Sequence, residues 1–131
     1  MISARLAGGV LEAPGGSLVL AEWTDAGESS RDAPIAPLHR HLEEEEAWYV
    51  LEGLLGFHVG DGEIVAEPGV AVVVPRGVPH TYWNAGDGVA RYLLVMGPKT
   101  ARLIEGIHAA TSRDLPTMQT LFRDHDSELL A

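Results

Sequence analysis

From Ser17 to about Met96 the chain alternates short apolar segments with turns that contain glycine or proline. The apolar segments are rich in branched and aromatic residues, which are typical of β-strands. The stretch 60–63, Gly-Asp-Gly-Glu, is a hairpin signal because glycine and aspartate tolerate the positive φ that such turns need. We therefore predict strands over residues 18–23, 47–51, 54–59, 63–66, 70–74, 80–83 and 89–96.

Beyond residue 97 the apolar positions recur at the spacing of helices instead of strands. Pro116 suits the first turn of a helix, where its missing N–H has no intrahelical partner to lose. We predict two short amphipathic helices, which pack on the outside of the β body or on a partner subunit. Their apolar positions are Leu103, Ile104 and Ile107 in the first, and Leu115, Met118, Leu121 and Phe122 in the second.

The many short strands and short connections indicate an all-β sandwich or barrel. With 131 residues, of which 46% are hydrophobic, the chain can bury a core of its own. We predict a single domain over residues 1–131, with a barrel at about 10–97 and a helical tail at about 98–131. The tail is assigned to the same domain because roughly 30 residues bury too little surface to fold alone.

Composition narrows the classes of function. The chain has no cysteine, so any metal must be held by nitrogen and oxygen, and a reducing cytoplasm is the expected location. A formal net charge of −10 repels phosphate backbones and anionic membrane surfaces. No apolar run has the length of a signal-peptide core or of a membrane span. We expect a cytoplasmic protein that binds neither nucleic acid nor membranes.

Two histidines separated by one residue, His39 and His41, precede four consecutive glutamates. Alternation along a strand places both imidazoles on one face, where they can bind one ion. Residues 43–45 are predicted to form a solvated turn, because charged side chains are rarely buried unpaired. Glu46 begins the apolar segment 47–51, so it is the glutamate that a strand can carry into the barrel.

Two ordered motifs make the chain resemble a single-domain cupin. The first family motif is G, five residues, HxH, three or four residues, E, six residues, G, and its matching positions are His39, His41, Glu46 and Gly53. Ala33 stands in place of its opening glycine. The second motif is G, five residues, PxG, two residues, H, three residues, N, matched by Gly69, Pro75, Gly77, His80 and Asn84. A lone HxH is a weak signal, whereas two ordered motifs are a strong one.

The resemblance implies a jelly-roll barrel in which one divalent transition metal ion is held by His39, His41, Glu46 and His80. Fe, Mn, Ni, Zn and Cu all suit three imidazoles and one carboxylate, so the sequence does not choose among them. One or two coordination positions would stay open for water, oxygen or substrate. Alternation from Glu46 and His80 places Trp48 and Tyr82 on the same faces as the ligands, either in a substrate pocket or in the core.

We expect a metal-dependent enzyme that acts on a small organic molecule, aromatic or polyketide-like, and specifically a dioxygenase. In this interpretation Glu46 is a ligand and, when detached, a proton acceptor. The alternatives are a polyketide cyclase or an isomerase that uses the metal as a Lewis acid, and a small-molecule-binding cupin without turnover. Apolar surface near the N-terminus and on the tail helices also predicts a homodimer.

Overall fold

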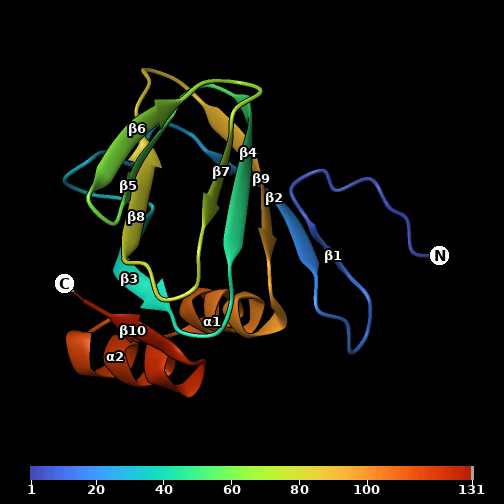
Figure 1. The fold of residues 1–131 in the computed structure, drawn as a ribbon, viewed down its shortest axis with the longest axis vertical. Helices are drawn as coiled ribbons and strands as arrows, with labels where there is room; N and C mark the ends of the chain where they lie inside the picture. The colour runs from blue at the N-terminus through green and yellow to red at the C-terminus, as the bar shows by residue number, and fades with distance from the viewer. Residues whose placement is uncertain (131) are drawn as a thin grey trace.

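Two five-stranded antiparallel sheets face each other in residues 1–130, the part of the chain that the computed structural model describes (Figure 1). The order in the first sheet is β1 (Val10–Glu12), β2 (Val19–Asp25), β9 (Ala90–Met96), β4 (Glu46–Glu52) and β7 (Ala71–Val74). The order in the second sheet is β10 (Ser127–Leu129), β3 (Ala36–His41), β8 (His80–Asn84), β5 (Leu55–Val59) and β6 (Gly62–Ala66). The predicted all-β jelly-roll architecture is confirmed.

Side chains of the first sheet alternate between the core and the outer face with the period of two that strands impose. One row across the inner face consists of Ala21, Leu94, Trp48 and Val72, all of them buried. The next inner row contains Glu46, two residues before Trp48 on the same strand. The alternation that buries the apolar residues of β4 therefore also carries the Glu46 carboxylate into the core.

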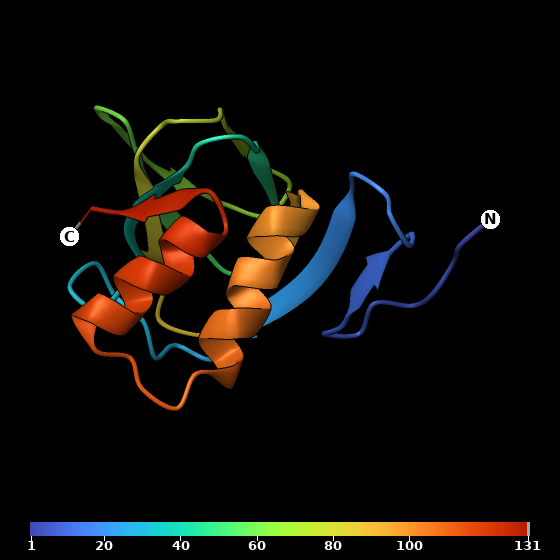
Figure 2. The ribbon, with the colours of Figure 1, turned by 90° about the horizontal axis from the view of Figure 1, so that it is seen from below.

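Two helices, α1 (Pro98–Ala109) and α2 (Leu115–Asp124), cover one end of the two sheets (Figures 1 and 2). The prediction of two tail helices is confirmed, but the tail is not only an outer appendage. Its last segment forms β10, which pairs with β3 and places Ser127 opposite His41. The three residues of β10 have little apolar character and no alternating pattern, so the sequence does not predict this strand or its pairing with β3. No helix in residues 1–130 has the length and hydropathy of a membrane span.

Glu44 attaches the helical tail to the β body. Its carboxylate accepts hydrogen bonds from the backbone N–H groups of Lys99 and Thr100 and from the Thr100 hydroxyl. These are free donors in the first turn of α1, and Gly97 at the N-cap has no side chain to satisfy them. The prediction of a solvated turn is therefore wrong for Glu44. Its two neighbours are exposed and form ion pairs, Glu43 with Lys99 and Glu45 with Arg76.

The outer face of the first sheet has a continuous apolar row, which is typical of an interface. Strand register aligns Leu11, Leu20, Val95, Ala47 and Val73 in this row. We predict that two copies associate through it and that Val73→Lys, which adds a charge to its most exposed member, weakens dimerisation about tenfold or more. Sedimentation velocity measures the mass.

Val65→Lys is the matched control for this prediction. Val65 is also a highly exposed valine, 60% against 64% for Val73, but it lies on β6 of the other sheet. The Val65→Lys protein should keep the mass of the wild type. A monomeric wild type at micromolar concentration would contradict the predicted homodimer.

Candidate metal centre

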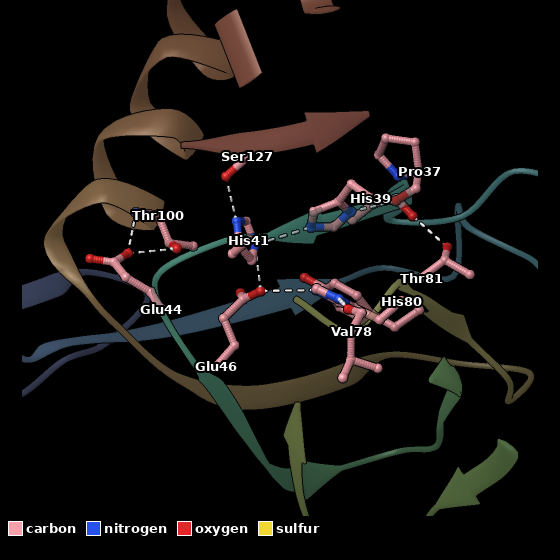
Figure 3. Close-up of polar contacts among 12 residues, drawn as sticks. Pro37, His39, His41, Glu44, Glu46, Val78, His80, Thr81, Thr100 and Ser127 are labelled. Carbon is pink, nitrogen blue, oxygen red and sulfur yellow. Dashed lines mark hydrogen bonds and ion pairs between the residues drawn. The ribbon is translucent and has the colours of Figure 1, made fainter. Parts of the chain in front are cut away.

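Four buried side chains meet between the sheets (Figure 3). His39 and His41 come from β3, Glu46 from the first position of β4, and His80 from the first position of β8. One possible ligand atom from each side chain lies within 4.8 Å of all the others. His80 lies 34 positions beyond Glu46 in sequence, and it is brought to the cluster by the pairing of β3 with β8 and by the facing of the two sheets.

The separations within this cluster fit one shared ion. The Oε1 atom of Glu46 lies 2.7 Å from Nε2 of His41 and 3.0 Å from Nε2 of His80. The Nε2 atoms of His39 and His41 are 3.2 Å apart. Two ligand atoms at about 2.1 Å from one ion and at right angles to each other would be about 3 Å apart. The donor set and its spacing are therefore those of a transition-metal site.

Backbone carbonyls fix the orientation of two of the imidazoles. Nδ1 of His39 lies 2.5 Å from the carbonyl oxygen of Pro37, and Nδ1 of His80 lies 2.9 Å from that of Val78. A carbonyl oxygen only accepts, so in both rings Nδ1 carries the proton and donates it. The Nε2 atoms of these two rings therefore face the centre of the cluster, where each can bind a metal ion once it carries no proton.

The third imidazole is oriented by the C-terminal strand. Nδ1 of His41 lies 2.7 Å from the hydroxyl oxygen of Ser127. That hydroxyl donates its own proton to the carbonyl oxygen of His125 at 3.2 Å, so it accepts the proton of His41 Nδ1. Hydrogen-bond partners of this kind fix the tautomer of metal-binding histidines and raise their basicity. Ser127 is thus a member of the site that the sequence prediction missed.

This arrangement places three imidazole Nε2 atoms and one carboxylate around the same point. Burial raises the pKa of Glu46, but the contacts with His41 and His80 outweigh it and hold the pKa well below its usual range. Burial and the adjacent imidazoles, His80 first and then His41, lower the pKa of His39 to about 4. At neutral pH the group is therefore an anion beside a neutral ring, and a divalent cation satisfies all four acceptors.

A cavity of about 870 Å³ reaches this cluster. Three of the four clustered residues line it, namely His39, His41 and Glu46. The rest of its wall is mostly apolar and is built by the inner face of the first sheet together with both tail helices. The main apolar contributors are Trp23, Leu94, Leu103, Ile104, Ile107, Met118 and Phe122. The helical tail thus forms part of the cavity, which its sequence does not reveal.

Trp48 and Tyr82 are both buried and both line the cavity, so each belongs to the core and to the pocket wall. Their rings pack edge to face with centroids 5.3 Å apart. Tyr92 from β9 is a further lining residue, and its hydroxyl oxygen lies 2.9 Å from that of Tyr82. Alternation along the segment 89–96 places Tyr92 on the inner face, and this signal was overlooked in the sequence.

The remaining histidines lie outside the cluster. His108 on α1 lines the cavity and packs against Trp23, with ring centroids 6.1 Å apart. His125 bonds locally, with Nδ1 2.8 Å from the carbonyl oxygen of Leu121. His58 lies on β5. None of these three histidines belongs to the buried cluster of His39, His41, Glu46 and His80.

Two facing antiparallel sheets that enclose three histidines and one glutamate, with a cavity leading to them, define a jelly-roll protein with a candidate mononuclear metal site. The chain belongs to the cupin family. The family's model, described as a cupin domain, matches residues 31–96, half of the chain, and this range contains all four clustered residues. The resemblance drawn from the two motifs is confirmed.

Solved structures with the same fold come from distant organisms. TT1209 from Thermus thermophilus is 26% identical over 63% of this chain and 73% of that chain, with a TM-score of 0.53. BH2720 from Bacillus halodurans is 19% identical over 63% of each chain, with a TM-score of 0.55. The cupin domain of Schizosaccharomyces pombe Cnp3 is 17% identical over 83% of this chain and 69% of that chain, with a TM-score of 0.57. No curated protein matches the chain.

Proposed function

We propose that this cupin is a metal-dependent enzyme that acts on a small, largely apolar organic molecule, aromatic or polyketide-like. The observation that supports this most directly is the cavity that reaches His39, His41 and Glu46. Catalytic metal sites keep a side open to substrate, whereas structural sites are closed by their ligands. A volume of about 870 Å³ also lies within the range of about 300 to 1,000 Å³ that is usual for small-molecule pockets.

A bound divalent transition metal, whether Fe, Mn, Ni, Zn or Cu, would supply Lewis-acid chemistry and, for a redox-active metal, oxygen chemistry. The chain itself supplies the other functions. Its apolar wall binds the body of the substrate and excludes water. Glu46 is a metal ligand that, when detached from the ion, acts as a proton acceptor. Dioxygenation is the reaction that we propose, because flat aromatic or enolic substrates suit a cavity lined by Trp23, Trp48 and Phe122.

A second candidate reaction is favoured by the hydroxyl pair of Tyr82 and Tyr92 in the cavity wall. Hydroxyl donors beside a Lewis acid stabilise the oxyanion of an enolate. This arrangement also suits a cyclase or an isomerase, in which the substrate is rearranged without consuming oxygen.

The test is to load the chelator-treated protein with each of the five metals and to follow oxygen uptake with a panel of flavonols and diketones. Dioxygenation predicts uptake together with loss of substrate, and it predicts that Glu46→Gln abolishes both. Substrate loss without oxygen uptake would replace dioxygenation by the cyclase or isomerase reaction. Saturable binding without loss of any substrate would contradict the proposed enzymatic activity and would indicate a non-catalytic small-molecule-binding protein.

Loss of the Ser127 hydroxyl should weaken metal binding about tenfold, which is the usual lower limit for removing a hydrogen-bond partner of a metal-binding histidine. In Ser127→Ala the proton on His41 Nδ1 loses its acceptor, so the ring is no longer held in the tautomer that binds metal. Competition with a chromophoric chelator measures the affinity.

Ser112→Ala is the control for this prediction. Ser112 is an exposed serine of the same tail, and its hydroxyl bonds to Asp114 instead of to a member of the cluster. Equal metal affinities for Ser127→Ala and the wild type would show that Ser127 does not position His41.

A further inference from the structure

The open end of the cavity lies at the segment that connects the two tail helices. Residues 110–114 link α1 to α2 (Figure 2). Arg113 in this segment and Leu115 directly after it are both exposed, and both line the cavity. The ligands of the candidate metal centre that line the same cavity are buried. The cavity therefore has a buried end at the metal centre and an open end that carries the Arg113 side chain.

Arg113 has no carboxylate partner. Six of the nine lysine and arginine side chains form ion pairs. Within residues 1–130 the other three are Arg5, Arg113 and Arg123, and of these only Arg113 lines the cavity. Asp114 follows it in the sequence, but its carboxylate accepts hydrogen bonds from the Thr117 N–H and the Ser112 hydroxyl instead. The unpaired cation at the cavity is therefore a specific exception in a chain of net charge −10.

The guanidinium of Arg113 is positioned by the end of α1 and keeps most of its donors free. Its Nη2 atom donates a hydrogen bond to the carbonyl oxygen of Ile107 at 3.3 Å. A guanidinium has several N–H donors, so the others remain available to a ligand. Outside the candidate metal centre, Glu22 is the other charged side chain that lines the cavity in residues 1–130, and it is paired with Arg91. The open end of the cavity thus favours a ligand with a negatively charged group.

We propose that Arg113 binds the carboxylate of an organic acid whose apolar body, aromatic or polyketide-like, occupies the cavity. A planar guanidinium matches the two oxygens of a carboxylate, and its one charge balances a carboxylate better than a phosphate, which carries more negative charge. The body of the acid then lies against the apolar wall and extends toward the candidate metal centre. The inference rests on the proposed function in that this acid is taken to be the substrate. Arg113 becomes the residue that selects and orients it.

The probes are cinnamate and cinnamamide, which have nearly the same planar shape and differ in that an amide replaces the carboxylate. Both are titrated against the chelator-treated full chain by ligand-observed NMR, and the ratio of the two affinities is determined. In Arg113→Gln the ratio should shift against cinnamate by about fivefold, the upper range for an ion pair in contact with solvent. The affinity for cinnamamide should change less than about twofold, because an exposed side chain is replaced.

Arg123→Gln is the matched control. Arg123 is also an exposed arginine of the tail without an ion pair in residues 1–130, but it bonds to the Thr120 hydroxyl and does not line the cavity. Its replacement should leave the ratio unchanged. Arg113→Lys should recover part of the preference for cinnamate, because lysine keeps the charge and loses the planar fork. Added salt should reduce the preference in the wild type and have little effect in Arg113→Gln.

The metal-free design separates this inference from the proposed function. An unchanged ratio in Arg113→Gln, or a wild type that binds neither probe, would overturn the carboxylate site even if the protein is an active metalloenzyme. A preference for cinnamate that appears only after zinc is added and persists in Arg113→Gln would also overturn it, because the metal would then hold the carboxylate. A shifted ratio in a protein that binds no metal would support the carboxylate site and contradict only the proposed enzyme.

Discussion

Alanine at Glu46 or at His80 is expected to lower the metal content of the purified protein from about one ion per chain to about a tenth or less. Losing the hydrogen-bond partner of a ligand already costs about tenfold to a hundredfold in affinity, and losing the ligand itself should cost at least as much. In Glu46→Ala the three imidazoles also lose the only negative charge of the cluster. Elemental analysis of protein purified without added metal gives the content directly.

Glu45→Ala is the matched control, because Glu45 is the adjacent glutamate but points outward. Its carboxylate is exposed and pairs with Arg76 at the surface, so its removal should leave the metal content unchanged. A wild-type protein without stoichiometric metal would contradict the proposed metal centre. So would Glu46→Ala and His80→Ala variants that both retain the ion.

Gly53→Ala should lower the free energy of unfolding by about 3 to 4 kcal/mol, which is large for the addition of one methyl group. Gly53 has a φ of +75°, and a Cβ built there would lie 2.2 Å from the carbonyl oxygen of Val89 and 2.9 Å from Cα of Ala90. These are backbone atoms at the start of β9, so neither can move aside as a side chain would. Urea unfolding, followed by far-UV circular dichroism, measures the change.

Gly69→Ala separates the two causes of this loss. Gly69 is also a motif glycine with a positive φ, +91°, but no atom lies within 4 Å of a Cβ added there. Alanine at this position should cost only the conformational strain, about 1 kcal/mol. Equal losses in the two variants would show that φ alone makes Gly53 necessary and that the close approach to β9 does not matter.

The members of the metal-site cluster could be predicted from the sequence where their positions depend on the alternation of side chains along a strand. Alternation along β3 and β4 places His39 and His41 on one face and selects Glu46 from a run of four glutamates. Spacing in the two motifs then identifies His80 as the fourth member of the cluster. These inferences succeed because a strand allows a side chain only two directions, and because each motif spans a short, continuous stretch of chain.

The parts that were missed depend on contacts between distant segments. Ser127 reaches His41 only because β10 pairs with β3, and its three-residue strand has no pattern to predict that pairing. Glu44 caps α1 only because the helix returns to the turn before β4. The residues next to Ser127 or Glu44 in the sequence do not differ from those around an ordinary solvent-exposed side chain. The local pattern therefore cannot show that either residue makes a contact with a distant segment.

The cap at Glu44 and the hydrogen bond at Ser127 connect the cavity wall to the metal ligands on two sides. Glu44 holds the start of α1 and lies two residues before Glu46, while Ser127 follows α2 and holds His41. Both helices line the cavity, so a motion that widens its mouth pulls on segments adjacent to two ligands. Under the proposed function we therefore expect substrate access and metal affinity to be coupled, so that a ligand that favours the closed tail and the metal ion raise each other's affinity by the same factor.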